Sequence, residues 1–145
     1  MVENASTVPL ASSEREAFDC FRILAQQGVT DIRGEYIEID LGNYVHVLDQ
    51  EERLEQIPWV APTLERPDSI IRLTGSRKGK RPRVTENYVK RIRESPNDPE
   101  GSIFVVGVER TRGHLRLRTW FMPARQEKYV QDLLKRGETI WEPKK

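Results

Sequence analysis

Residues 103–121 read IFVVGVERTRGHLRLRTWF, and this stretch decides the fold. Two β-rich runs flank a polar turn that contains Gly113, which is the pattern of a β-hairpin. The first run, residues 103–108, is almost wholly apolar, as expected for a strand buried on both faces. The second run, residues 114–121, alternates between two kinds of side chain, so it predicts a strand with two different faces.

The predicted faces of the second strand differ sharply in chemistry. The cationic and aromatic side chains share one face: His114, Arg116, Arg118 and Trp120. The opposite face is predicted to carry Leu115, Leu117, Thr119 and Phe121, unless twist or a bulge turns Thr119 toward the arginines. A cationic and aromatic face fits phosphates and bases. Equally, the long stems of arginine and tryptophan can cover a neighbouring helix.

The charges are distributed unevenly along the chain. The 145 residues predict one domain, and with 37% hydrophobic and 32% charged residues its core is modest and its surface polar. Net charge is only +1, but residues 1–56 hold twelve acidic and four basic side chains, whereas residues 57–145 hold eleven acidic and twenty basic ones. This asymmetry favours a polyanion-facing surface in the second part, although the two parts could also pair with each other.

The single cysteine, Cys20, excludes an internal disulfide, and no Cys/His spacing predicts a zinc site. We expect Cys20 to be half-buried rather than a nucleophile. Neither a secretory signal nor a long apolar run occurs in the sequence. A soluble protein of a reducing compartment is therefore expected, cytoplasmic or delivered by a specialised machine, without a membrane partner.

The remaining pattern predicts an α+β fold: N-terminal helices packed on a roughly four-stranded antiparallel sheet, with one further helix near the C-terminus. A capping box at residues 13–16 begins a helix that Gly28 ends. Further strands are predicted at 37–41, 44–48, 84–92 and 138–141, and helices at 50–57 and after Pro123. The proline-rich residues 58–72 and the basic residues 76–83 are predicted to be loops. Residues 1–12 are expected to be a disordered tail, and residues 13–145 one domain.

Several kinds of active site are missing from the sequence. It has no glycine-rich phosphate loop, no nucleophile elbow and no His-Glu-x-x-His motif. No tight Asp/Glu cluster falls on the predicted core strands, which disfavours a nuclease that depends on a divalent metal. We therefore predict no metal and no cofactor. The candidate catalytic residues are His114, Arg118, Thr119, Lys90, Arg116 and His46.

This set fits the metal-free cleavage of RNA. A base takes the proton of a ribose 2′-OH, which attacks the adjacent phosphorus, and cations stabilise the charge that builds on the phosphorane. Since the 2′-OH is the nucleophile, DNA is not a substrate. Further candidates for substrate binding are the basic residues of the 76–83 segment and side chains of neighbouring strands: Arg77, Lys78, Lys80, Arg81, Arg83, Tyr88, Arg91 and Trp120.

The order of several segments resembles the phage-associated barnase–EndoU–colicin–RelE-like nucleases of the BECR fold (PBECR type). The segments are WVAPTLERPDSI at 59–70, Tyr-Val-Lys at 88–90, a valine-rich strand, and Arg-Thr-Trp-Phe at 118–121 before a closing strand. The similarity covers about residues 30–142. It implies helices on a four-stranded antiparallel sheet and a metal-independent ribonuclease, found in toxins or attached to phage structural proteins.

Carried over by position, the resemblance implies roles for Arg118, Thr119 and Lys90. Many such nucleases carry a histidine in the helix before the proline-rich segment, but residues 54–57 read LEQI here. His46 or His114 would have to replace it, or the chain is catalytically weak. Three functions thus stay open: a ribonuclease acting on RNA such as tRNA; an inactive nucleic-acid-binding or phage-structural module; and an antitoxin or immunity protein that binds a partner through its acidic first part.

Overall fold

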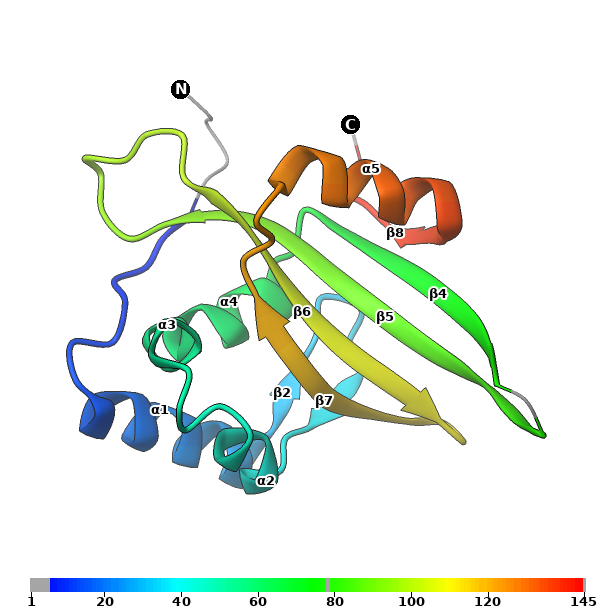
Figure 1. The fold of residues 1–145 in the computed structure, drawn as a ribbon, viewed down its shortest axis with the longest axis horizontal. Helices are drawn as coiled ribbons and strands as arrows, with labels where there is room; N and C mark the ends of the chain where they lie inside the picture. The colour runs from blue at the N-terminus through cyan, green and yellow to red at the C-terminus, as the bar shows by residue number, and fades with distance from the viewer. Residues whose placement is uncertain (1–5, 78, 145) are drawn as a thin grey trace.

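The computed structural model describes residues 6–77 and 79–144, with the side chains of residues 76, 77, 80 and 81 outside the description. Within these residues one mixed sheet of eight strands has the order β2-β3-β7-β6-β5-β4-β8, and β1 pairs with β5 (Figure 1). The strands are β1 (Ser6–Thr7), β2 (Val29–Thr30), β3 (Tyr36–Glu38), β4 (Ser69–Arg77), β5 (Lys80–Arg93), β6 (Ser102–Thr111), β7 (His114–Phe121) and β8 (Glu138–Trp141). The helices are α1 (Glu14–Gln27), α2 (Leu41–Val45), α3 (Glu51–Glu55), the 3₁₀ helix η1 (Ile57–Trp59), α4 (Val60–Glu65) and α5 (Gln126–Arg136).

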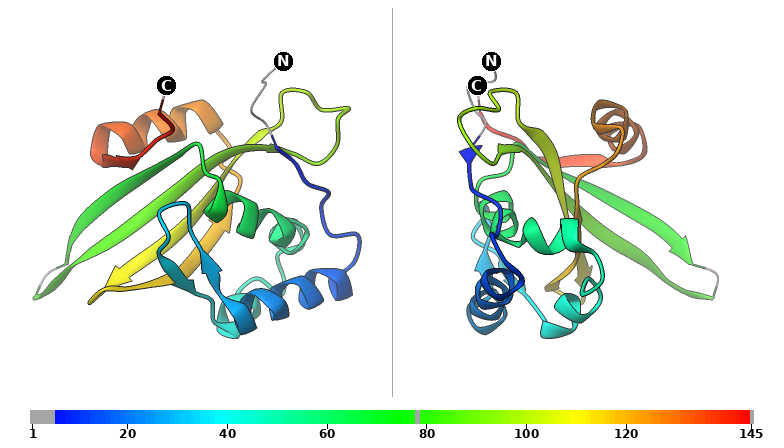
Figure 2. Two further views of the ribbon diagram at one scale, coloured as in Figure 1. Left: turned by 180° about the vertical axis from the view of Figure 1, so that it is seen from behind. Right: turned by 60° about the vertical axis from the view of Figure 1, so that its left-hand side comes forward.

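The sheet separates two hydrophobic cores. Figures 1 and 2 show α1 and α4 on one face of the sheet and α5 on the other. The larger core packs Phe21 of α1 and Leu64 of α4 against the sheet, and the smaller core packs Leu133 of α5 against it. Neighbouring residues of β6 enter different cores, Phe104 the larger and Val105 the smaller. The prediction that residues 103–108 are buried on both faces is therefore confirmed.

The predicted hairpin is confirmed as β6–β7. Thr111 pairs with His114, which leaves a two-residue turn of Arg112 and Gly113 with φ values of 50° and 83°. Two central residues with positive φ are the hallmark of the turn whose twist matches that of the strands. Glycine adopts this region without steric cost, which explains Gly113.

A β-bulge interrupts β7 and changes which residues share a face. Gly107 pairs with Thr119 and Val108 with Leu117, so Arg118 is an extra residue without a partner in the ladder. As a result, Trp120 joins the larger core, where its Nε1 donates a hydrogen bond to the backbone oxygen of Arg53 at 2.8 Å. The prediction of strict alternation was wrong beyond residue 117, because the bulge shifts the period by one.

The predicted strand at 44–48 was also wrong, since the end of α2 and the turn that follows it occupy this region. Asp40 caps the helix by accepting a hydrogen bond from the Gly42 amide at 2.6 Å, and the Asn43 side chain accepts one from the Asp40 amide. Tyr44 and Val47 are buried three residues apart, which is helical spacing. Apolar residues over so short a run do not distinguish a strand from a helix.

The α+β class is confirmed, but the sheet is larger than predicted and is mixed. Strand β3 runs parallel to β7, and β1 runs parallel to β5. The proline-rich segment, predicted to be a loop, forms η1 and α4, and most of β4 lies where the sequence predicts loops. Ser6–Thr7 fall in the expected tail, yet they pair with β5. Strands of two residues are too short to show a hydrophobic period, so the sequence does not reveal them.

Candidate nucleic-acid interface

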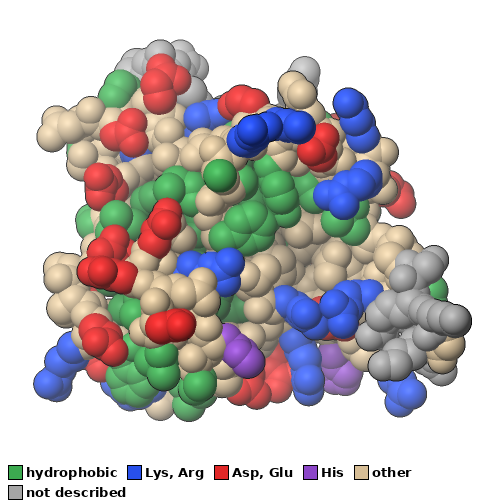
Figure 3. Space-filling model, in the orientation of Figure 1, with side chains coloured by type: hydrophobic (Ala, Val, Ile, Leu, Met, Phe, Trp, Pro, Cys, Tyr) green, Lys and Arg blue, Asp and Glu red, His purple; other side chains and the backbone are tan. Residues whose placement is uncertain are grey.

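The helix α5 covers only part of its face of the sheet, and the uncovered part is polar. We call it the open face; it consists of Arg83, Thr85 and Asn87 of β5, Gly107 and Glu109 of β6, and Arg116, Arg118 and Thr119 of β7. Figure 3 shows basic side chains gathered below the centre of this side of the molecule. Because β-strand side chains alternate, these residues stand on the face opposite the larger core.

Two arginines contact one carboxylate on the open face, and a third arginine is its cross-strand neighbour. Arg118 donates from Nη1 to Glu109 Oε2 at 2.7 Å, and Arg83 Nε lies 3.8 Å from Glu109 Oε1. Arg116 is the partner of Glu109 in the ladder, and its Nε lies 3.5 Å from Glu38 Oε2. Side chains of Arg83, Arg116 and Arg118 are 40%, 69% and 43% exposed, whereas that of Glu109 is 20% exposed. Guanidinium groups carry five donors each, so these arginines keep N–H groups directed at solvent.

The side chains of Thr119 and Asn87 both lie next to Gly107 on the open face. A Cβ atom added to Gly107 would lie 3.1 Å from Thr119 Cγ2 and 3.8 Å from Asn87 Oδ1. The Asn87 side chain is held in place because its Nδ2 donates to the backbone oxygen of Ile71 at 3.3 Å. The bulge thus brings the Thr119 side chain to the same face as Arg116 and Arg118, whereas strict alternation would have placed it on the opposite face.

A groove of about 730 Å³ continues from the open face, between α3 and the start of α5. Phe121, the next residue of β7 on the same face after Thr119, forms part of its floor. The rings of Phe121 and Tyr129 meet edge to face, with centroids 5.4 Å apart. Figure 3 shows apolar side chains at the centre of the molecule, with acidic ones to their left and basic ones above.

Both histidines are exposed. His114 begins β7 beside a hollow of about 230 Å³ that Glu35 and Tyr36 also line. His46 is the C-terminal cap of α2. Figure 3 shows the two histidines on the same side of the molecule, on either side of basic side chains. His114 and Arg116 are two positions apart on β7, a separation of about 7 Å.

The comparisons with known proteins give the family. Residues 14–142 match the model of a family described as PBECR2, the phage-Barnase-EndoU-ColicinE5/D-RelE like nuclease2 family. The chain belongs to this family. No curated protein and no solved structure matches the chain significantly. Of the described residues, none form a helix long and apolar enough to cross a membrane.

In this PBECR2 chain, several candidates from the sequence lie away from the open face. Tyr88 is fully buried in the larger core, where it donates to Asp31 Oδ2 at 2.6 Å and burial raises its pKa. Arg91 forms an ion pair with Glu127 of α5 at 2.9 Å. Trp120 is buried as described above. Arg77, Lys80 and Arg81 contribute backbone to the β4–β5 hairpin, but their side chains, like the whole of Lys78, lie outside the described residues.

Lys90 is only 4% exposed and points toward the helices, on the side opposite the arginines. Its Nζ donates to the backbone oxygen of Arg66, at the C-terminus of α4, at 2.6 Å. Burial lowers the pKa of this amine, partly offset by the charge of Asp68. The geometry assigns Lys90 to the attachment of α4 to the sheet.

We expect Lys90→Met to leave RNA binding and any RNA cleavage within about twofold of wild type. The variant keeps the apolar stem and loses the cost of a buried charge along with one hydrogen bond. The two effects oppose each other, so the free energy of unfolding should change by no more than about 1 kcal/mol. Urea unfolding and RNA cleavage measure both. If the variant folds but does not cleave RNA, Lys90 takes part in the active site after all.

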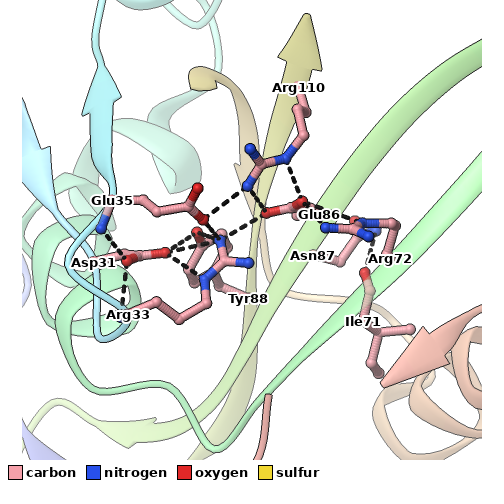
Figure 4. Close-up of polar contacts among 9 residues, drawn as sticks. All are labelled: Asp31, Arg33, Glu35, Ile71, Arg72, Glu86, Asn87, Tyr88 and Arg110. Atoms are coloured by element: carbon pink, nitrogen blue, oxygen red, sulfur yellow. Dashed lines mark hydrogen bonds and ion pairs between the residues drawn. The ribbon is translucent and has the colours of Figure 1, made fainter. Parts of the chain in front are cut away.

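A second charged cluster lies on the helix side of the sheet (Figure 4). The Glu86 side chain has no solvent exposure and is contacted by Arg33, Arg72 and Arg110 at 2.7, 2.9 and 2.7 Å. Burial alone would raise the pKa of Glu86, but hydrogen bonds from the three guanidinium groups outweigh it and lower the pKa to about 2.

The cluster around Glu86 is electrically balanced. Arg33 also contacts Asp31 at 2.8 Å, and Arg110 contacts Glu35 at 2.7 Å. Three carboxylates thus face three guanidinium groups, which leaves little net charge for a polyanion. The described residues contain no group of three His, Cys, Asp or Glu side chains that could hold a metal ion. We interpret the cluster as a structural link between the β2–β3 hairpin at one edge of the sheet and strands β4, β5 and β6.

The sequence reasoning missed Glu109, Asn87 and the groove. Glu109 had a usable signal, because the turn at residues 112–113 sets a register that puts Glu109 opposite Arg116. The alternation along β5 already placed Asn87 on the face opposite Lys90. The sequence did not show which of these two faces belongs to the site. The groove had no local signal, since its walls come from α3, β7 and α5.

Proposed function

We propose that this chain is a metal-independent endoribonuclease that binds RNA on the open face. The observation that carries the proposal is the bulge at Arg118, which turns the Thr119 side chain to the same face of the sheet as Arg116 and Arg118. The carboxylate of Glu109 contacts Arg118 and lies close to Arg83. A base, fixed cations and a hydroxyl on one accessible surface are the groups that RNA cleavage by an internal nucleophile requires. Membership of a nuclease family supports the same reaction class.

In the proposed reaction Glu109 accepts the proton of the ribose 2′-OH. The bond from the 2′-oxygen to phosphorus forms while the bond from phosphorus to the 5′-oxygen breaks. Arg116 and Arg118 stabilise the charge on the phosphorane oxygens, and Thr119 donates a hydrogen bond to one of them. His114, at the edge of the same face, or a water molecule gives the departing 5′-oxygen its proton. The products are a 2′,3′-cyclic phosphate and a 5′-hydroxyl.

The test is cleavage of total tRNA and of a single-stranded RNA in EDTA, with DNA of the same sequence as the control substrate. Wild type should cut RNA to cyclic-phosphate ends and leave DNA intact. Arg118→Ala should slow cleavage by about 10²-fold, the size expected for loss of one group that stabilises transition-state charge. His114→Ala tests the acid. Arg22→Ala is the matched control, because Arg22 is exposed on α1. Equal rates for the Arg118 and Arg22 variants would contradict the proposed site.

A non-catalytic nucleic-acid-binding or phage-structural module is the second candidate. Two observations favour it: the arginines of the open face already pair with carboxylates, and α3 contains no histidine. This function predicts salt-dependent RNA binding without cleavage. The third function from the sequence is that of an antitoxin or immunity protein. It predicts neither RNA binding nor RNA cleavage. It predicts a complex with a basic protein, formed through acidic side chains such as Glu51 and Glu52.

A further inference from the structure

The groove between α3 and α5 contains a buried acceptor without a partner. Gln56 is 3% exposed and lines the groove, and its Oε1 has no hydrogen-bond partner among the described residues. The other amide atom, Nε2, is 3.5 Å from Glu52 Oε1, which orients the amide with its nitrogen toward α3. A buried carbonyl without a donor is unfavourable, so a ligand whose N–H reaches this oxygen gains a hydrogen bond there.

Flat apolar surface lies next to this acceptor. Phe121 and Tyr129 are half-buried and meet at an interplanar angle of 90°, so one ring presents its face where the other presents its edge. Met122 and Pro123 extend the apolar floor. Aromatic side chains of this kind stack planar heterocycles, and every nucleobase has such a flat face.

The two walls of the groove carry opposite charge. The α3 wall holds Glu51, Glu52 and Arg53, and the α5 wall holds Arg125, Lys128 and Asp132, so the net charge is negative on the first wall and positive on the second. Arg125 and Lys128 are exposed. A complementary ligand has hydrogen-bond donors on one side, a planar apolar body in the middle and negative charge on the other side. A nucleotide whose base bears an exocyclic amino group has this arrangement.

We propose that the groove is a subsite for a nucleobase with an exocyclic amino group: adenine, guanine or cytosine, in preference to uracil, whose only donor, N3–H, lies between two carbonyl oxygens that the carboxylates of Glu51 and Glu52 repel. The amino group donates to Gln56, the base lies on the aromatic floor, and Arg125 and Lys128 bind the phosphate. Because Phe121 follows Thr119 on the same face of β7, the bound nucleotide adjoins the proposed cleavage site. As an RNA subsite the groove rests on the proposed function, but nucleotide binding itself can be measured without cleavage.

The experiment titrates the full chain with AMP, GMP, CMP and UMP and follows backbone amide chemical shifts. At least one amino-bearing nucleotide should bind about tenfold more tightly than UMP, the effect of one hydrogen bond to a buried group. Gln56→Met keeps the side-chain length and should abolish this preference. Gln50→Met is the matched control, since Gln50 lines the same groove and is exposed. Tyr129→Leu should weaken the binding of all four nucleotides.

The subsite proposal would be overturned by equal affinities for the four nucleotides or by an unchanged preference in Gln56→Met. Chemical-shift changes confined to the amides of Arg116 and Arg118 would overturn it as well. Competition by an amphipathic peptide at the same amides, with no nucleotide binding, would overturn it in favour of a protein-docking groove. The two proposals fail differently. RNA cleavage without base preference refutes the subsite alone, whereas selective nucleotide binding without cleavage refutes the nuclease reaction alone.

Discussion

Replacing Glu86 by glutamine is expected to lower the free energy of unfolding at pH 7 by about 3–5 kcal/mol, the range for breaking a buried ion pair. The buried carboxylate neutralises Arg33, Arg72 and Arg110, which come from the β2–β3 loop, β4 and β6. Without its charge the three guanidinium groups repel one another in a partly buried space. Urea unfolding followed by tryptophan fluorescence measures the loss.

The matched control is Glu38→Gln. Glu38 also pairs with an arginine, but its side chain is 53% exposed and the contact to Arg116 is 3.5 Å. Exposed pairs contribute at most about 1 kcal/mol, so this variant should unfold almost as wild type does. Equal losses in the two variants would show that the Glu86 cluster is not the stabilising link that its geometry indicates.

Lowering the pH should destabilise the wild-type chain in the same way as Glu86→Gln does. The folded-state pKa of Glu86 is about 2, below the ordinary value of 4.5, so the ionised form stabilises the fold. This contribution is fully present above pH 4.5 and is lost as the pH falls from 4.5 to 2. The difference in pKa corresponds to roughly 3 kcal/mol. Glu86→Gln should lack this part of the acid dependence, and parallel pH profiles for the two chains would contradict it.

Replacing Glu109 by glutamine is expected to lower kcat for RNA cleavage by about 10²–10⁴-fold, the range for loss of a general base. Glutamine has the shape of glutamate but does not accept the 2′-OH proton. RNA binding should stay the same or tighten, because a negative charge leaves the surface that Arg83, Arg116 and Arg118 form. Cleavage rates at saturating RNA, together with binding at several salt concentrations, separate the two effects.

Glu38→Gln serves as the control here too, since it removes one carboxylate beside the same arginine cluster. Its cleavage rate should stay within a few-fold of wild type. If Glu109→Gln cuts RNA as fast as this control, Glu109 only neutralises Arg118. The next hypothesis is then that His114 is the base, and the cleavage rate of His114→Ala tests it.

The candidate site was partly predictable from the sequence. Arg116 and Arg118 lie on an exposed strand face, as the alternation indicates, because the hairpin turn and the period of two are local properties. Glu109 could have been added from the register that the turn imposes. Lys90 could not have been excluded, since a strand residue shows no preference between faces until the helices that cover one of them are placed.

The sequence by itself determined the β6–β7 hairpin, the helix α1 with its Ser13 cap and Gly28 end, and the α+β class. These features depend on residues that are close along the chain. Only the tertiary structure decided that Arg118 bulges, so that Thr119 joins the arginines and Trp120 enters the core. It also decided the Glu86 cluster and the groove. Both depend on contacts between segments far apart in the chain, and no local period or spacing encodes such contacts.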